Sequence, residues 1–360
     1  MLFENSIIHN KIKSFFEQVI NNERLAHAYL FHGKAGSGKT AFALELAKAC
    51  NCQNTDKPCG QCPSCIKIEK SAHPDVKLLF PLSKAAREDK YLELLKEKTL
   101  HPFKKLPLAG HLNIPIESIR ELKKEAMYAP FEARRRFFII SGIEFFSREA
   151  ANSFLKLLEE PPDNLQIILI SNDYNSVIET IRSRCQPVLF PQLDDDQIEQ
   201  IVLKYTSDVK NLTTLIRINE GNIEEIIEQL GQKEEDMRPL VLDFIRAAAK
   251  SDAIEINTII EQIVETRDKN KALEFINLMI LWLADAFRYN VLQNAETLSN
   301  ADMQEVIGKF ADHYSDVDYG TLTDPLEEAY SDIKSNLNVN LTLTNLAISI
   351  KNHLTVKKTV

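Results

Sequence analysis

The sequence predicts an α/β fold in which a parallel sheet is built by the first 190 residues and the rest of the chain is helical. Three observations support this. Short apolar runs alternate with amphipathic helical stretches up to Pro191, a glycine-rich turn joins the first apolar run to a helix, and beyond Pro191 only helical periodicity remains. Apolar runs without a polar face are typical of strands covered on both sides, which favours a parallel sheet.

The expected elements follow one another along the chain. Residues 6–22 carry apolar side chains at helical spacing and are expected to form the first helix. The five expected strands are residues 28–31, 76–80, 136–141, 166–171 and 188–190. Helices are expected over 41–50, 116–129 and 148–158, and the last of these stops before Pro161-Pro162. Residues 83–110 are rich in Lys, Glu and Leu, which predicts a partly helical insertion with a solvated surface.

Three domains are expected, since 360 residues exceed what one compact core usually accommodates. The sheet domain is expected over residues 1–190. Residues 191–235 are expected to form a small domain of two or three short helices, with the Glu-rich residues 232–236 as a linker. Long amphipathic helices are expected to build a third domain over residues 236–360.

The composition is that of a globular protein without a general affinity for nucleic acid. The chain has 43 basic and 52 acidic residues and a formal net charge of −9, so a broad basic face is not expected. Its 44% hydrophobic and 26% charged residues exclude a disordered chain. The most apolar stretch of the C-terminal half, 272–287, is too short for a bilayer and contains Glu274 and Asp285. The N-terminus lacks the pattern of a signal peptide, so a cytoplasmic protein without a membrane partner is expected.

Residues 33–40, Gly-Lys-Ala-Gly-Ser-Gly-Lys-Thr, match the phosphate-loop pattern G-x-x-x-x-G-K-[ST] between an expected strand and an expected helix. Glycines let successive backbone N–H groups turn inward around phosphate, Lys39 is expected to reach the β- and γ-phosphates, and the Thr40 hydroxyl is expected to bind Mg²⁺. A chance match, or a loop that no longer binds, is the alternative. The expected cofactor is ATP or ADP with Mg²⁺, held by Gly33, Gly36, Ser37, Gly38, Lys39 and Thr40.

Five of the six cysteines fall within sixteen residues, which in a reducing compartment indicates metal binding before disulfides. Cys59-x₂-Cys62-x₂-Cys65 supplies three thiolates, and a fourth completes a tetrahedral, structural zinc site. Cys50 lies on the apolar stripe of its helix, whereas Cys52 follows the helix in a loop that can fold back. We therefore expect Cys52, Cys59, Cys62 and Cys65 to hold Zn²⁺ in a module over about residues 50–70. Cys50 is the alternative fourth ligand, and free structural cysteines are the alternative to a metal site.

Several motifs together resemble the bacterial clamp loaders of DNA polymerase III, which are AAA+ ATPases. The resemblance covers roughly residues 5–230. Besides the phosphate loop and the cysteines, the motifs are Arg24-Leu25-Ala26-His27-Ala28, His73-Pro74-Asp75, Leu157-Leu158-Glu159-Glu160-Pro161-Pro162 and Ser183-Arg184-Cys185. The last two are the most diagnostic.

The resemblance implies an architecture and a site residue. It implies that residues 1–190 are a RecA-like AAA+ domain, 191–235 a helical lid, and 236–360 a helical collar that holds five subunits in a ring. It also implies that Arg184 is an arginine finger, which contacts the γ-phosphate of ATP bound by a neighbouring subunit.

The departures from the resemblance indicate which subunit the chain is similar to. The motor subunits, gamma or tau, carry Asp-Glu after the third strand, where this chain has Ser141 and Gly142. Neither residue binds metal through a carboxylate or polarises water, and Glu144, two residues further on, is the alternative carboxylate. Motors also carry a lid arginine where this chain has Glu224, which is expected to repel phosphate, and tau carries a long extension for which 360 residues leave no room.

A retained finger without hydrolytic residues is typical of the delta-prime subunit, the stator of the ring. The expected function is therefore that of a stator that loads the sliding clamp on primed DNA as part of a polymerase III holoenzyme, without ATPase activity of its own. Expected partners are the gamma or tau and delta subunits and, indirectly, the clamp and primer-template DNA. The alternatives are an ATP-hydrolysing gamma/tau-type motor, hence an enzyme, and a zinc-stabilised interaction module unrelated to replication.

Overall fold

The computed structural model describes residues 3, 9–107, 110–206, 212–231, 236–265, 269–292 and 298–355. The chain divides into two compact units. The first combines Met1–Lys210 with Asn219–Gln232, and the second combines Asn211–Ile218 with Lys233–Val360. Among the described residues, two large clusters of buried apolar side chains lie within the first unit and one lies within the second.

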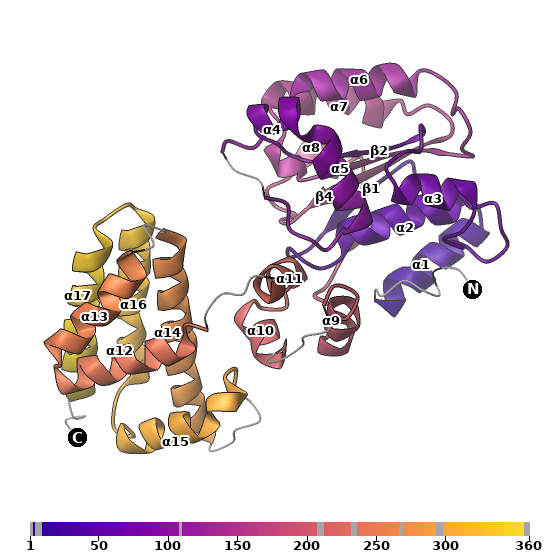
Figure 1. Cartoon of the computed structure of the whole chain (residues 1–360). Helices are drawn as coiled ribbons and strands as arrows, with labels where there is room; N and C mark the ends of the chain where they lie inside the picture. Colours follow the sequence, from indigo (N-terminus) through magenta and orange to yellow (C-terminus); the bar gives the residue numbers. More distant parts are fainter. Residues whose placement is uncertain are drawn as a thin grey trace. The chain divides into compact units, whose positions relative to one another are not determined.

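The first unit has helices on both faces of a sheet (Figure 1). Its strands are β1 (Ala28–His32), β2 (Val76–Leu79), β3 (Arg136–Ser141), β4 (Leu165–Ser171) and β5 (Gln186–Leu189). Its helices are α1 (Asn10–Asn21), α2 (Lys39–Asn51), α3 (Pro63–Glu69), α4 (Lys84–Asp89), α5 (Tyr91–Leu100), α6 (Ile116–Ala126), η1 (Ile143–Phe145), α7 (Arg148–Glu159), α8 (Glu179–Arg182), α9 (Asp195–Val202) and α11 (Ile223–Gly231).

The five strands form one parallel sheet in the order β2-β3-β4-β1-β5. β1 lies inside the sheet, where Leu30 is opposite Leu169 of β4 on one side and Pro187 of β5 on the other. Proline has no N–H to donate, and it is tolerated here because β5 is an edge strand. Since all strands are parallel, the segments that follow β1, β3 and β4 meet at one edge of the sheet.

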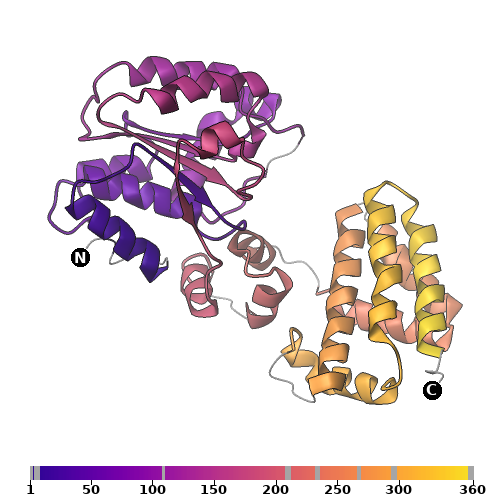
Figure 2. The same ribbon diagram turned by 180° about the vertical axis from the view of Figure 1, so that it is seen from behind.

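Alternate residues of the strands face the two helix layers, which Figure 2 shows from behind. In β1, Tyr29 and Phe31 join the apolar core that includes α1 and α2, whereas Ala28 and Leu30 join the core that includes α6 and α7. Burial on both faces is the reason why these strands are continuous apolar runs in the sequence.

The α/β class and the five expected strands are confirmed, and the strand ends differ from the expected ones by at most two residues. Residues 6–8 of the first expected helix lie outside the described residues. The prediction for the insertion is right only in part. α4 and α5 are helical, but Leu94 and Leu106 are buried in the core beside α1 and α2, so only one face of the insertion is solvated. Residues 108–109 of the insertion are not among those described.

The His73-Pro74-Asp75 motif has a structural role at the start of β2. Asp75 is fully buried, and its carboxylate accepts hydrogen bonds of 2.8, 2.8 and 3.0 Å from the backbone N–H groups of residues 131–133. It also pairs at 3.0 Å with Arg136, the first residue of β3. Burial alone would raise the pKa of Asp75, but these hydrogen bonds lower it to about 2. The carboxylate thus fastens the segment before β3 to the start of β2.

The second unit consists of helices. They are α10 (Leu212–Ile218), α12 (Arg238–Lys250), α13 (Ala253–Val264), α14 (Lys269–Leu292), η2 (Ala301–Met303), α15 (Gln304–His313), α16 (Tyr319–Lys334) and α17 (Val339–Thr355). α14 is the central helix, because it contacts α12, α13, α15 and α16. Its side chains Phe275, Met279 and Trp282 are fully or almost fully buried in the core of this unit.

α14 is longer than the apolar stretch noted in the sequence. By length and composition its segment Lys271–Leu292, with a mean hydropathy of 1.2, would be long enough to cross a membrane. However, its apolar side chains form the core of the second unit. Asp285 is also buried there, and its carboxylate accepts backbone N–H hydrogen bonds from Ser299 and Asn300 at 2.9 and 2.8 Å. The apolar composition of α14 is therefore explained by its burial in the core of a globular unit.

Three short helices, α9, α10 and α11, occupy the stretch 191–235 that was expected to form a small helical domain. α9 and α11 belong to the first unit, whereas α10 belongs to the second. The domain boundaries at 190 and 235 therefore stay predictions. Residues 232–235 of the expected linker lie outside the described residues.

Asp75→Asn should lower the free energy of unfolding by about 3–5 kcal/mol at pH 7, because Arg136 would keep a buried charge without its partner. The pKa of Asp75 is about 2 in the folded chain and about 3.9 in an unfolded one. The stabilisation is therefore present above about pH 4 and is lost as the pH falls towards 2. Urea unfolding of wild type and variant at pH 7 and at pH 3 measures both effects. The exposed Asp163→Asn is the control, and a loss below about 1 kcal/mol at pH 7 would contradict this role.

Candidate nucleotide and metal sites

The phosphate loop lies at the carboxyl end of β1 and leads into α2. Gly36 and Gly38 have φ angles of 74° and 82°, which lie in the left-handed region that residues other than glycine rarely adopt. Gly38 is also the N-cap of α2. A Cβ atom at Gly36 would lie 2.3 Å from the Asn222 side-chain oxygen and 2.6 Å from the Ile223 backbone nitrogen, at the start of α11. The loop therefore needs glycine at both positions, and the positive end of the α2 dipole faces it.

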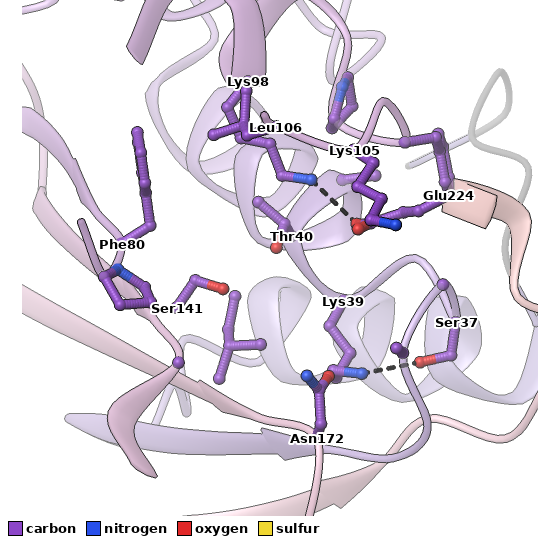
Figure 3. Close-up of a pocket in the computed structure, with 18 of the residues that line it drawn as sticks. Ser37, Lys39, Thr40, Phe80, Lys98, Lys105, Leu106, Ser141, Asn172 and Glu224 are labelled. Carbon is purple, nitrogen blue, oxygen red and sulfur yellow. Dashed lines mark hydrogen bonds and ion pairs between the residues drawn. The ribbon is translucent and has the colours of Figure 1, made fainter. Parts of the chain in front are cut away.

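A pocket of about 340 Å³ opens beside the loop (Figure 3). Its lining comes from the loop and α2 (residues 35–41), the end of β2 (Phe80, Pro81), the insertion and the segment after it (Lys98, Pro102, Phe103, Lys105, Leu106, Leu112), the end of β3 and η1 (Ser141, Gly142, Glu144, Phe145), the end of β4 (Ile170, Asn172) and α11 (Glu224). Of the residues expected to bind nucleotide, Gly36, Ser37, Gly38, Lys39 and Thr40 line the pocket, and Gly33 does not.

The Lys39 ammonium is held by the loop itself. Lys39 is only 5% exposed, and its Nζ donates to the carbonyl oxygens of Gly33 and Lys34 at 2.7 and 2.6 Å. Burial lowers the pKa of Lys39 to about 8, while two nearby carboxylates act in the opposite direction. The side chain therefore stays mostly protonated at pH 7 and keeps a positive charge under the loop.

The pocket wall at the end of β3 begins with two residues that carry no carboxylate, Ser141 and Gly142. Glu144 of η1 lies in the same wall. Its Oε1 accepts a 3.4 Å hydrogen bond from the backbone N–H of Asn172, and its Oε2 is buried with no hydrogen-bond partner in the part of the chain that the structure describes. One carboxylate oxygen in this wall is thus free to accept from water or to bind a cation.

The insertion and α11 form another wall of the pocket. Lys98 of α5 pairs with Glu224 of α11 at 2.9 Å, and Lys105 pairs with Glu225 and Glu228 of α11, both at 2.8 Å. The expectation that Glu224 would repel phosphate considered only this carboxylate and not its ion-pair partner. In the folded chain its charge is balanced by the neighbouring Lys98 ammonium.

The four cysteines expected to share a metal ion come together. The sulfur atoms of Cys52, Cys59, Cys62 and Cys65 all lie within 4.8 Å of one another. Cys52 follows α2, Cys62 is the N-cap of α3 and Cys65 lies in its first turn, so the group joins the end of α2 to the start of α3. The Cys52 and Cys62 sulfurs are 3.9 Å apart, close to the edge of about 3.8 Å of a tetrahedron with Zn–S bonds of about 2.3 Å.

The surroundings of the sulfurs fit a metal site. The backbone N–H groups of Gln61 and Cys62 donate to the Cys59 sulfur and lower the pKa of this thiol to about 6, which favours the thiolate form. Cys50 is not part of the four-sulfur group and packs against the apolar core beside α2, where burial raises its pKa to about 12. The cysteine group could therefore hold a metal ion without Cys50.

Arg184 is not among the residues that line this pocket, and it lies in the turn between α8 and β5. Its guanidinium donates to the Glu159 carboxylate at 2.7 Å and to the Thr180 carbonyl oxygen at 2.9 Å. The next residue, Cys185, is buried in the core beside α7, where burial raises its pKa to about 12. The two most diagnostic motifs are thus in contact, because Glu159 belongs to the Leu-Glu-Glu-Pro-Pro segment.

Three polar or charged side chains of the pocket were missed by the sequence analysis, namely Lys98, Lys105 and Asn172. Asn172 directly follows β4, and a polar residue just after a parallel strand is a signal that could have indicated it. Lys98 and Lys105 belong to a Lys- and Glu-rich segment in which no pattern distinguishes a pocket residue from a solvated one.

Two family profiles match most of the chain. The profile described as DNA polymerase III, delta subunit, matches residues 8–194, and the one described as DNA polymerase III, delta subunit, C terminal, matches residues 243–352. The chain belongs to the DNA polymerase III delta subunit family. The first match includes the phosphate loop, the four cysteines and Arg184, so the family assignment rests on the region that carries the candidate sites.

Curated relatives and solved structures are from the same group of proteins. DNA polymerase III subunit delta' of Bacillus subtilis is 32% identical over 211 residues, which cover 58% of this chain and 55% of that protein. Subunit tau of Escherichia coli is 28% identical over 265 residues, 71% of this chain and 34% of that protein. The chain thus spans about half or less of these relatives. A gamma subunit-related protein of Thermotoga maritima has a TM-score of 0.41 at 16% identity, covering 95% of this chain and 99% of that one, so the family assignment comes from the sequence matches.

The four-sulfur group predicts one bound metal ion for each chain. Elemental analysis of the purified chain should find about one transition-metal ion, and Cys62→Ser should lose most of it on dialysis against a chelator, because one of the four thiolates is missing. Cys50→Ser is the matched control and should retain the ion. An equal metal content in Cys62→Ser and wild type would contradict a site of four cysteines.

Proposed function

We propose that this chain is a delta-prime-like subunit of the DNA polymerase III clamp loader, a stator that completes a neighbour's active site without turning over ATP itself. The observation that carries the proposal is a pocket with an intact phosphate loop whose wall begins with Ser141 and Gly142. Neither residue can order Mg²⁺ through a carboxylate or polarise an attacking water. Membership of the family and 32% identity to a delta-prime subunit support the same assignment.

The pocket is proposed to bind ATP or ADP with Mg²⁺. The backbone N–H groups of the glycine-rich loop and the Lys39 ammonium supply the positive charge that a di- or triphosphate needs, and the Thr40 hydroxyl is suited to Mg²⁺. A nucleotide that is bound but not hydrolysed acts as a ligand of the folded state and stabilises the first unit.

The ion of the cysteine group is proposed to be Zn²⁺. Four thiolates suit a tetrahedral zinc site and leave no open coordination position, so the ion would be structural. Its place between α2 and α3 supports a role in fixing the segment that connects them.

Arg184 is proposed to be a finger that acts on ATP bound by a neighbouring subunit. Support comes from its absence from the lining of the pocket in its own chain and from its contact with Glu159, which aligns the guanidinium. The side chains of Arg184 and Glu159 are 35% and 49% exposed, and such pairs contribute only about 0–1 kcal/mol. The guanidinium can therefore leave Glu159 for a γ-phosphate, whose charge it stabilises in the transition state.

This role implies a hetero-oligomer. The proposed partners are the gamma or tau and delta subunits and, indirectly, the sliding clamp and primer-template DNA. The net charge of −9 supports indirect contact with DNA, because an acidic chain has no general attraction for phosphate backbones. A cytoplasmic location belongs to the same proposal.

Arg184→Ala should leave the chain folded and reduce ATP hydrolysis by the assembled loader. The rate at the active site that Arg184 completes should fall by about a thousandfold, because an arginine finger contributes at least this factor. Single-turnover hydrolysis by a loader reconstituted with the variant measures it. Arg120→Ala, which changes an exposed arginine of α6, is the control. Unchanged ATP hydrolysis by the loader assembled with Arg184→Ala would contradict the proposed role of Arg184 as an arginine finger.

A second candidate function is that of an ATP-hydrolysing motor subunit of the gamma/tau type. One observation favours it: the Glu144 carboxylate lines the pocket, with one oxygen that has no hydrogen-bond partner among the described residues. Such an oxygen could orient a water molecule, although Glu144 lies two residues beyond the position of the catalytic carboxylate in motors.

ATP hydrolysis by the purified chain alone separates the two candidates. A stator should show no turnover above background with or without primed DNA. A motor should show turnover that Glu144→Gln reduces about a hundredfold or more and that Glu149→Gln, an exposed substitution in α7, leaves unchanged. Turnover with this pattern would replace the stator assignment.

A further inference from the structure

We propose that Lys98, from the insertion, is a ligand for the polyphosphate of a nucleoside di- or triphosphate in the nucleotide pocket, and that Glu224 of α11 is its partner only while the pocket holds no polyphosphate. The inference rests on the proposed nucleotide binding and adds a residue that no phosphate-loop pattern contains. It also gives the insertion over residues 83–110 a function.

The first support is the place of Lys98 in the pocket. Figure 3 shows Lys98, Lys105 and Glu224 entering from one side and Lys39 and Ser37 from the other, with Thr40 between them. A polyphosphate seated on the loop would therefore have the insertion on its open side. Burial of the Lys98 side chain, which is 11% exposed, places its charge where water screens it little.

The second support is the set of partners of the Lys98 ammonium. Its Nζ contacts the Glu224 carboxylate at 2.9 Å and donates to the Lys104 carbonyl oxygen at 3.1 Å. An ammonium has three N–H donors, so the described residues use two of them and one remains for a phosphate oxygen. A lysine with so little exposure is rare unless it is paired, and the pair with Glu224 explains how the charge is kept in the unliganded pocket.

The third support is the charge of the site. Glu224 lies in the first turn of α11, directly after the residues that touch Gly36 of the phosphate loop. A lone carboxylate there would oppose a phosphate. Both Glu224 and Lys98 are near enough to affect the pKa of Lys39, in opposite directions. A polyphosphate that binds on the loop would attract the Lys98 ammonium more strongly than the single carboxylate of Glu224 does, because it carries several negative charges.

A competing explanation is that the pair only ties α5 to α11. Lys105 is an example of such a tie, because it pairs with both Glu225 and Glu228 of α11 and is more exposed than Lys98. The two explanations predict opposite results. If the pair is only a tie, removing either partner weakens nucleotide binding equally. If Lys98 is a ligand, removing Lys98 weakens binding, whereas neutralising Glu224 leaves it unchanged or strengthens it.

The test measures binding of ADP and ATP with Mg²⁺ to the full chain by calorimetry. Lys98→Met should raise the Kd about tenfold or more, the loss of one charge-assisted contact. Glu224→Gln should keep or lower the Kd, and Lys98→Arg should stay within a few-fold of wild type. Lys96→Met, which changes an exposed lysine of the same helix that does not line the pocket, is the matched control and should have no effect.

Thermal unfolding of each variant checks that the chain is folded, and Lys98→Gln replaces Lys98→Met if the latter is not. A Kd that is unchanged in both Lys98 variants, or raised equally by Lys98→Met and Glu224→Gln, would overturn the inference and leave the proposed nucleotide site intact. Absence of ADP and ATP binding to the wild-type chain would instead overturn the nucleotide site itself, and the inference with it.

Discussion

The parallel direction of the five strands is the constraint on which the pocket beside the phosphate loop depends. Because all carboxyl ends lie at one edge, the phosphate loop after β1, the Ser141–Glu144 segment after β3 and Asn172 after β4 come together there. The buried pair of Asp75 and Arg136 acts at the opposite edge, where β2 and β3 begin. It joins the start of β2 to the start of β3, at the end of the sheet away from the pocket.

Within the pocket, basic and acidic side chains lie close together. The ammonium groups of Lys39 and Lys98 share the pocket with the carboxylates of Glu144 and Glu224. Charges on an exposed surface are screened by salt, whereas Lys39 is only 5% exposed and the Lys98 side chain only 11% exposed, so water screens these two charges little. The proposed affinity for phosphate is therefore expected to depend on these local charges and on the N–H groups of the loop more than on the total charge of the chain.

The features that the sequence predicts well are those determined by neighbouring residues. The predicted ends of the strands agree with the structure to within two residues, because burial on both faces of the sheet requires an apolar run in the sequence. The phosphate loop needs glycines at Gly36 and Gly38 for its own backbone conformation. Cys52 could be distinguished from Cys50 because the helix ends between them, which leaves Cys52 free to turn towards the later cysteines. In each case the physical cause lies within a few residues of the pattern.

The insertion shows why the rest could not be predicted. Lys98 and Glu224 are 126 positions apart in the sequence. The residues next to each of them in the sequence are typical of a solvent-exposed position. Their pairing comes from tertiary packing: the start of α11 approaches Gly36 of the phosphate loop, and Leu94 of α5 is buried in the core. Coulomb attraction depends on the distance between charges and is indifferent to the element that carries them. The positive charge beside Glu224 thus comes from α5, and comparison of the residues of α11 alone does not reveal it.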